Sequence, residues 1–171
     1  MKKKKKKFKL KKSHKYTILF VLFMLSIYLI QVITIKYNKS PVIIHPETEK
    51  YEVYFNYIFD GDTAVFINKE DMQEIICRFL AVDAPEIDEE GYDEAKSFSN
   101  MKLRNAKNII LEIEPHSEKY DKFERLLAWV WVDEELLQAA LIEKQLVEIA
   151  YVYDEYLYTA YLKRLQENVT K

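Results

Sequence analysis

Twenty consecutive positions, residues 16–35, carry no charged side chain, and this run divides the chain more sharply than any other feature. With a rise of about 1.5 Å per residue, a helix of this length spans about 30 Å, the thickness of a bilayer's hydrocarbon core. Ten lysines precede the run within residues 1–15, whereas only Lys36 and Lys39 follow it closely. Because cationic flanks stay in the cytoplasm, the pattern predicts a transmembrane anchor at 16–35 behind a basic cytoplasmic segment at 1–15.

Two other interpretations of this run fit less well. A cleaved signal peptide has an apolar region of about 7–15 residues that ends in a small-residue cleavage site. The run here is longer, and residues 29–35 contain no such pattern. A buried core helix would need polar spacing that the run lacks. We therefore expect an uncleaved single-pass anchor in the cell membrane, with the remainder of the chain outside the cell.

The remainder has room for one domain. Residues 36–50 lack periodicity and predict a linker, so the domain is expected at 51–171. Segments rich in β-branched and aromatic residues predict five strands, at 51–59, 63–68, 72–82, 108–114 and about 124–132. Helices are predicted at 91–107, after a cap at Asp133, and at roughly 155–168. This order predicts an α+β fold, a five-stranded oligonucleotide-binding (OB) barrel with packed helices, preceded by one transmembrane helix.

The charge of the expected domain restricts how it can bind nucleic acid. From Ser40 onward 14 Lys and Arg residues face 28 Asp and Glu residues, a net charge of 14 − 28 = −14. Such a surface excludes binding through widely distributed basic contacts, so any phosphate binding must be local. Cys77 is the single cysteine, which excludes an intramolecular disulfide.

Two short motifs carry candidate chemistry. The first, DGDT at 60–63, lies where the first strand turns into the second and taken alone is typical of a turn. The second, RFLAVDAPE at 78–86, places Arg78 within an apolar strand, where a guanidinium needs a partner or a function. With the hairpin turn centred between Lys69 and Glu70, paired positions sum to about 139, which sets Asp62 opposite Cys77 and beside Arg78.

The residues gathered by this hairpin suggest a hard cation. Asp62 and Asp83, with a backbone carbonyl and water, would form an all-oxygen site suited to calcium. The three histidines are scattered along the chain and Cys77 is alone, which argues against zinc.

With a third motif, DKFERLLAWVWVD at 121–133, and with GYDEA and AYVY, the chain resembles the staphylococcal nuclease family over about residues 51–165. The resemblance implies an OB-fold endonuclease that uses calcium. It implies that Asp62, Asp83 and the carbonyl of Ala84 bind the metal. It implies that Glu86 is the general base, that Arg78 and Arg125 bind the phosphate, and that Tyr151 and Tyr153 lie beside the nucleotide. Lys122, in the third motif, is expected to contact substrate.

The function so implied is calcium-dependent hydrolysis of DNA and RNA outside the cytoplasm, which leaves 3′-phosphate and 5′-hydroxyl ends. We expect single-stranded substrate to be favoured, because unpaired bases can stack on tyrosines. The alternatives are a membrane-anchored nucleic-acid-binding module of the same fold without catalysis, and a surface interaction protein that uses the tyrosines of the last helix.

Overall fold

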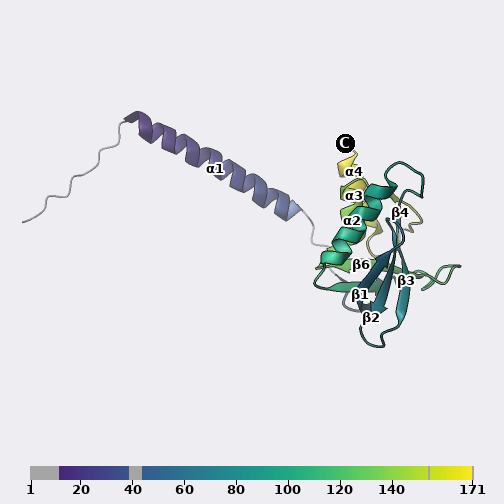
Figure 1. Cartoon of the computed structure of the whole chain (residues 1–171). Coiled ribbons are helices and arrows are strands. Elements are labelled where there is room, and N and C mark those ends of the chain that lie inside the picture. Colours follow the sequence, from purple (N-terminus) through teal and green to yellow (C-terminus); the bar gives the residue numbers. More distant parts are fainter. Residues whose placement is uncertain (1–11, 39–43, 154, 171) are drawn as a thin grey trace, which may run out of the picture. The chain divides into compact units, whose positions relative to one another are not determined.

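The computed structural model describes residues 12–38, 44–153 and 155–170, and the chain divides into two units, residues 1–41 and 42–171. In the first unit, helix α1 (Lys12–Asn38) contains the whole uncharged run (Figure 1). Most of the predicted basic segment and residues 39–43 of the predicted linker lie outside the described residues. Among the described residues, no helix is both long and apolar enough to cross a membrane. The membrane span at 16–35 stays a prediction.

The second unit is built on a closed barrel of five strands, as the sequence predicts. Antiparallel pairing gives the order β3-β2-β1-β5-β6, and parallel pairing of β3 with β6 closes the barrel. The strands are β1 (Lys50–Ile58), β2 (Thr63–Asn68), β3 (Glu74–Phe79), β5 (Ile109–Ile113) and β6 (Leu126–Val132).

Among the described residues of this unit, three helices and three short strands complete the fold. The helices are α2 (Tyr92–Asn105), α3 (Leu137–Glu143) and α4 (Thr159–Val169), and the short strands are β4 (Val82–Asp83), β7 (Glu135–Leu136) and β8 (Glu148–Ile149). Strand β4 pairs with β8, which fixes the chain on both sides of the candidate site. Helix α4 begins four residues later than predicted.

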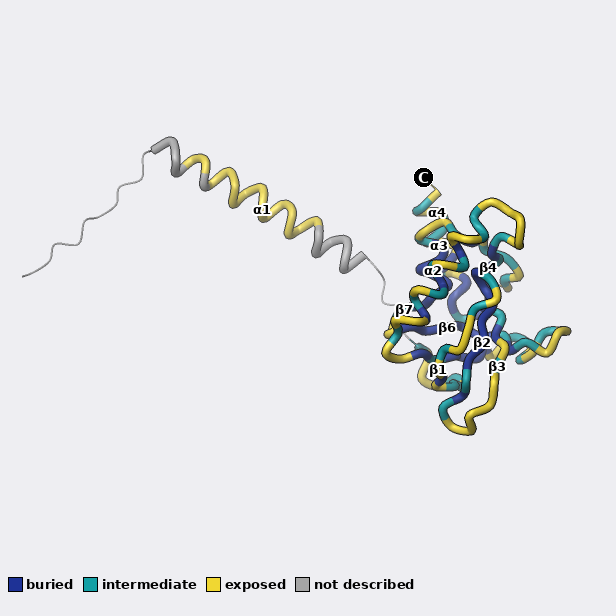
Figure 2. Tube along the Cα trace, in the orientation of Figure 1, coloured by how far each residue is buried: buried dark blue, intermediate teal, exposed yellow. Residues whose placement is uncertain are grey.

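The core fills the barrel and the space beneath the helices, where Figure 2 shows dark blue along β2 and β6. Inward positions of the strands alternate with outward ones, and apolar side chains such as Phe66, Phe79 and Leu111 are at most 1% exposed. Trp129 and Trp131 of β6 are equally buried, and their indole N–H groups donate to Glu114, directly after β5, and to Glu112 of β5. The tryptophans thus bind β6 to two buried carboxylates.

Glu112 also holds the start of the domain. Its Oε1 accepts a 2.8 Å hydrogen bond from the backbone N–H of His45 and a 2.6 Å bond from the Thr48 hydroxyl. The chain therefore enters the barrel already fastened to β5.

Two sequence predictions are wrong in detail. In the β2–β3 hairpin Thr63 pairs with Arg78, so paired positions sum to 141 and Asp62 does not lie opposite Cys77. The loop is longer than its turn residues suggest, because Met72 adopts φ 61° within it.

The second correction concerns Asp133, which does not cap a helix. Asp133 and Glu134, both at positive φ, form the tight turn between β6 and β7. The Asp133 carboxylate accepts hydrogen bonds from the backbone N–H groups of residues 107 and 108.

Candidate active site

Arg78 on β3 lies at the centre of the site and joins two carboxylates. Its Nη2 is 2.8 Å from Asp83 Oδ1 and 3.1 Å from Asp62 Oδ2. Its Nη1 donates to the carbonyls of Phe79, at 2.9 Å, and Val82, at 2.7 Å. Because a guanidinium has five N–H donors, these four contacts leave the Nε–H as the donor that the described protein contacts do not use.

Asp62 is the buried carboxylate of the pair, at 4% exposure. Its Oδ2 accepts a 2.6 Å hydrogen bond from the N–H of Ala84, and its Oδ1 accepts one from the Thr63 hydroxyl. Burial raises the pKa of Asp62 to about 7, despite the opposing effects of Arg78 and the Ala84 N–H, and the nearby Asp60 raises it further.

The loop that carries Asp62 is held tightly against α2. A Cβ at Gly61 would lie 2.7 Å from the Cβ of Ala84 and 2.8 Å from that of Ala95, distances that no ordinary contact allows. The Ser99 hydroxyl of α2 donates a 2.7 Å hydrogen bond to the Gly61 carbonyl. Glycine is thus required at position 61 for the loop that carries Asp62 to approach Ala84 and α2.

The donor set fits a hard cation. Asp62 and Asp83 both contact Nη2 of Arg78, Asp83 is half-exposed, and the buried Ala84 follows it directly. Among the described residues, no group of three or more His, Cys, Asp or Glu side chains is arranged to hold a metal. Two carboxylates with a carbonyl and waters suit calcium, which accepts such mixed oxygen ligands.

Arg125 enters the site beside Arg78, because it directly precedes β6, which pairs in parallel with β3. Its Nε and Nη2 each lie 2.7 Å from Asp121 Oδ2, and its backbone N–H donates to Asp121 Oδ1. Burial acts to raise the pKa of Asp121, but the hydrogen bonds from Arg125 and from the Phe123 N–H outweigh it, so the pKa is lowered. Asp121 therefore stays ionised and holds Arg125, which keeps three N–H donors outside this pair.

The loop before Arg125 is shaped by an unusual backbone. Glu124 adopts φ 63°, a conformation that favours glycine. The Phe123 ring is 65% exposed and lies 5.4 Å from Arg125 Cζ and 4.9 Å from Lys122 Nζ. Two cations therefore flank one exposed ring at the mouth of the site.

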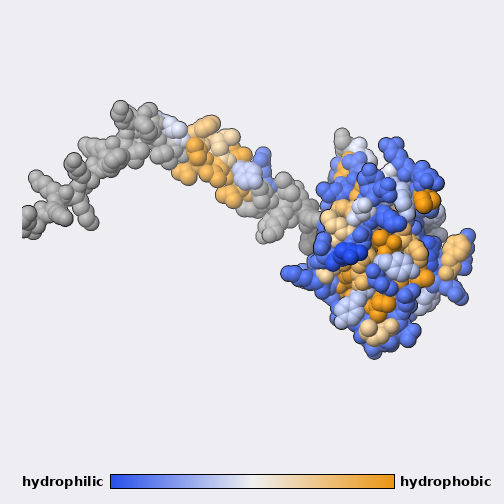
Figure 3. Space-filling view, in the orientation of Figure 1, coloured by the Kyte–Doolittle hydropathy of each residue, from blue (hydrophilic) through white to orange (hydrophobic). Residues whose placement is uncertain are grey.

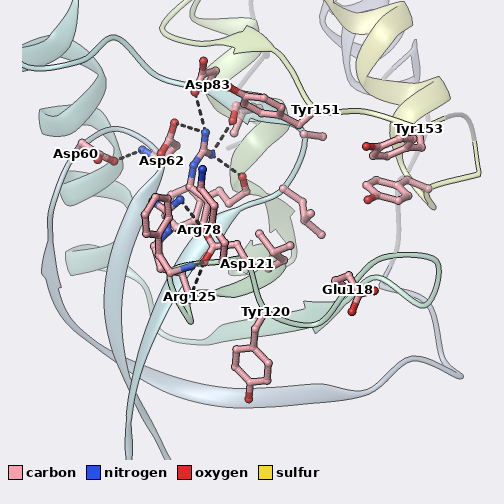
Figure 4. A pocket seen from close by; sticks show the side chains of 18 of the residues that line it. Asp60, Asp62, Arg78, Asp83, Glu118, Tyr120, Asp121, Arg125, Tyr151 and Tyr153 are labelled. Atoms are coloured by element: carbon pink, nitrogen blue, oxygen red, sulfur yellow. Dashed lines mark hydrogen bonds and ion pairs between the residues drawn. The ribbon is translucent and has the colours of Figure 1, made fainter.

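A cavity of about 660 Å³ brings these side chains together (Figure 4). Eight of the nine sequence-predicted site residues line it: Asp62, Arg78, Asp83, Glu86, Lys122, Arg125, Tyr151 and Tyr153. The ninth, Ala84, is not in the lining but contacts Asp62 through its N–H. Glu86 is exposed at the rim, and Tyr151 and Tyr153 are 73% and 57% exposed.

The cavity also contains residues that the sequence analysis did not single out. Asp60 lines it and accepts the N–H of Asp62. Tyr120 and Tyr156 line it as well, and the Tyr156 ring packs 5.2 Å from that of Tyr153. The first aspartate of the DGDT motif was the available signal for Asp60. No local sequence motif indicated that Tyr120 and Tyr156 would line the cavity.

The domain is a closed five-stranded barrel, and a pocket lined by carboxylates and arginines lies at its rim. The chain belongs to the family described as staphylococcal nuclease homologue, whose profile matches residues 76–171, more than half of its 171 residues.

Several characterised proteins are similar to this chain. Endonuclease YncB of Bacillus subtilis (strain 168) is 33% identical over 119 residues, covering 64% of this chain and 54% of YncB. SPbeta prophage-derived endonuclease YokF of the same strain is 32% identical over 111 residues, covering 62% and 36%. Thermonuclease of Staphylococcus hyicus is 25% identical over 139 residues, covering 78% of each chain. The chain thus spans about half the length of YncB and about a third of YokF.

Proposed function

We propose that the domain is a calcium-dependent endonuclease that hydrolyses phosphodiester bonds of DNA and RNA, favours single strands, and leaves 3′-phosphate and 5′-hydroxyl ends. The observation that carries this proposal is that Arg78 and Arg125, held next to each other by the parallel pairing of β3 with β6, line one cavity that also contains Asp62, Asp83 and Glu86. The names of the relatives, two endonucleases and a thermonuclease, support it.

Each residue has a role that follows from its contacts. Asp62, Asp83 and the Ala84 carbonyl would hold calcium, which when bound supplies positive charge beside the scissile phosphate. Arg125 offers three N–H donors to the phosphate oxygens, whereas Arg78, held by four protein contacts, contributes mainly fixed positive charge and its Nε–H. Such preorganised charge stabilises the negative charge that develops on the oxygens around the five-coordinate phosphorus.

Glu86 is suited to act on water. It lies at the exposed rim of the cavity, where a solvent molecule can reach its carboxylate. We assign it the removal of a proton from the water that attacks phosphorus in line with the leaving 5′-oxygen. Lys122, Tyr151 and Tyr153 then hold the neighbouring nucleotide, the lysine by charge and the tyrosines by stacking.

We also propose that residues 16–35 anchor the chain in the cell membrane, with the N-terminus in the cytoplasm and the nuclease domain outside. The support is the uncharged run and the ten lysines before it. Protease added to intact cells should release the domain and leave a short membrane-bound fragment. Full protection of the domain in intact cells would contradict this topology.

The activity is tested by incubating labelled single-stranded DNA with the chain and calcium. We expect internal cuts whose products accept 5′-phosphate from a kinase, because their 5′ ends carry hydroxyl groups. Binding of the DNA without any cleavage would instead support a non-catalytic binding module.

A further inference from the structure

The outer face of β1 presents aromatic rings to solvent. Tyr54 is 56% exposed, Tyr57 43% and Phe59 45%, and the rings of Tyr57 and Phe59 meet edge to face at 5.1 Å. Strand alternation directs Val53 to the core and Tyr54 outward. A bulge between Phe55 and Tyr57 then changes the register. The rings therefore project from the side of the barrel that the core does not use.

Neighbouring strands extend this face. Tyr57 pairs with Val65 of β2, which pairs with Ile76 of β3, and Tyr54 pairs with Ile67. Val65 is itself buried, so Ile76 and the half-buried Ile67 extend the face, and the exposed Glu74 pairs with Ile67 at its edge. Ile76 is 39% exposed. Figure 3 shows orange and pale side chains gathered over β1 and β2, bordered by blue. The result is an open sheet surface of aromatic and aliphatic side chains, which we term the β1 face.

Cations border the β1 face although the domain is strongly acidic. Lys69 Nζ lies 5.2 Å from the centre of the Tyr54 ring, and a groove of about 260 Å³ beside it is lined by Lys69, Arg104 and Lys107. The side chains of Arg104 and Lys107 are exposed. The neighbouring carboxylate, Glu52, is 3.5 Å from Lys69 and largely in solvent, where such a pair contributes little.

A further cation lies at the other end of the face. Lys96 Nζ is 5.2 Å from the centre of the Tyr92 ring, and the Tyr92 hydroxyl donates a 3.3 Å hydrogen bond to the Phe59 carbonyl. Aromatic rings with cations at both ends match single-stranded nucleic acid, whose bases stack and whose phosphates need positive charge.

The β1 face leads to the candidate active site. Phe59 is followed directly by Asp60, which lines the catalytic cavity. At about 3.3 Å per residue, Tyr54 lies roughly 16 Å along the strand from Phe59. A strand bound on this face would thus extend towards the cavity.

We propose that the β1 face is a second, non-catalytic site that binds single-stranded nucleic acid, with bases on Tyr54, Tyr57 and Phe59 and phosphates on Lys69, Arg104 and Lys107. This inference rests on the proposed nuclease function, because it identifies the substrate of that activity as a long single strand. Its binding chemistry does not need the catalytic residues.

The test compares binding and cleavage in the full chain in detergent. Fluorescence anisotropy measures binding of labelled oligothymidylate of about 15 nucleotides, and of a control of about three, with a chelator present so that no cutting occurs. One variant combines Tyr54→Ala with Tyr57→Ala, and another combines Arg104→Glu with Lys107→Glu. Met101→Ala and Lys144→Glu, at exposed positions elsewhere, are the matched controls. Circular dichroism verifies that each variant is folded.

We expect the aromatic variant to bind the long oligonucleotide at least about tenfold more weakly, since stacking on each ring contributes substantially. The charge variant should lose about 1.4 from the slope of log affinity against log salt, about 0.7 for each cation removed. With calcium, both variants should need about tenfold more long substrate for half-maximal rate and should cleave the short one as the wild type does. The controls should match the wild type throughout.

Unchanged affinity for the long oligonucleotide in both variants would overturn the inference. So would a variant that keeps its affinity but loses self-association, because the face would then be a protein interface. A wild-type chain that cuts neither substrate with calcium would overturn the proposed function, whereas the binding comparison in chelator would still decide on the β1 face.

Discussion

Tyr158 donates a 2.8 Å hydrogen bond to Glu112 Oε2, and both side chains are buried. Burial and the hydrogen bond to Glu112 raise the pKa of Tyr158, so the hydroxyl stays protonated and remains a donor. The same carboxylate oxygen accepts the indole N–H of Trp131 at 2.7 Å. The segment that leads into α4 is thus joined to β5 and β6 through one buried carboxyl group.

Removing the Tyr158 hydroxyl should therefore destabilise the domain. We expect Tyr158→Phe to lower the free energy of unfolding by about 1.5–3 kcal/mol, the contribution of a hydrogen bond to a charged group. Urea unfolding of a fragment that begins at Ser40 measures the change. Tyr153→Phe, at an exposed position, should stay within about 0.5 kcal/mol of the wild type. Equal loss in both variants would show that the Glu112 contact is not the cause.

Calcium should control both activity and stability. We expect cleavage by the same fragment to stop when a chelator is added and to return with excess calcium. At a calcium concentration of about 100 times Kd, bound metal should stabilise the fold by about 2.7 kcal/mol, seen as a rise in Tm. Asp83→Asn should remove most of that rise. Full activity in excess chelator would contradict the metal assignment.

Arg125 and Glu86 should contribute to rate rather than to folding. Arg125→Ala and Glu86→Gln should each lower kcat by about 10²–10³, because each removes a preorganised group that acts on the transition state. Single-turnover cleavage of a labelled oligonucleotide measures this, and Lys144→Ala serves as an exposed control. A variant with a rate near that of the wild type would lose its assigned role.

The pKa of Asp62 predicts a pH dependence of stability. Because its folded pKa is raised to about 7 from an ordinary value of 3.8, the stability that this group contributes is complete below about pH 4 and is lost as pH rises through 7. The Asp62→Asn variant does not lose this stability as pH rises, because asparagine does not titrate. Without calcium, the free energy of unfolding of the variant minus that of the wild type should therefore increase from pH 4 to 7 and then level off. A difference that falls or stays constant over this range would contradict the raised pKa.

Local signals predicted the barrel well. Residues 63–68 were predicted as a strand with the bounds that β2 has, because its β-branched and aromatic residues end at a clear turn. The two-residue strands β4 and β8 were not predicted, since so short a pairing leaves no periodicity in the sequence. The register of the β2–β3 hairpin was wrong by two because the left-handed backbone of Met72 has no residue signal.

The sequence predicted those residues of the site that belong to recognisable motifs. Spacing and family resemblance named eight of the residues that line the cavity and placed Asp62 beside Arg78, but neither indicated that Asp121 would hold Arg125 or that Arg78 would also contact Asp83. Those pairings depend on how strands and loops meet in three dimensions. The β1 face was missed for a related reason, since alternation does not show which exposed rings lie beside cations from α2.

The attachment of His45 and Thr48 to Glu112 has a mechanical consequence. A force that pulls on the chain ahead of the domain would act first on these two hydrogen bonds. Both are accepted by Glu112, a residue of strand β5 in the barrel. The loops that carry Arg125 and Tyr151 would not be in the line of force. Force on the chain ahead of His45 would therefore reach β5 before it reached the cavity.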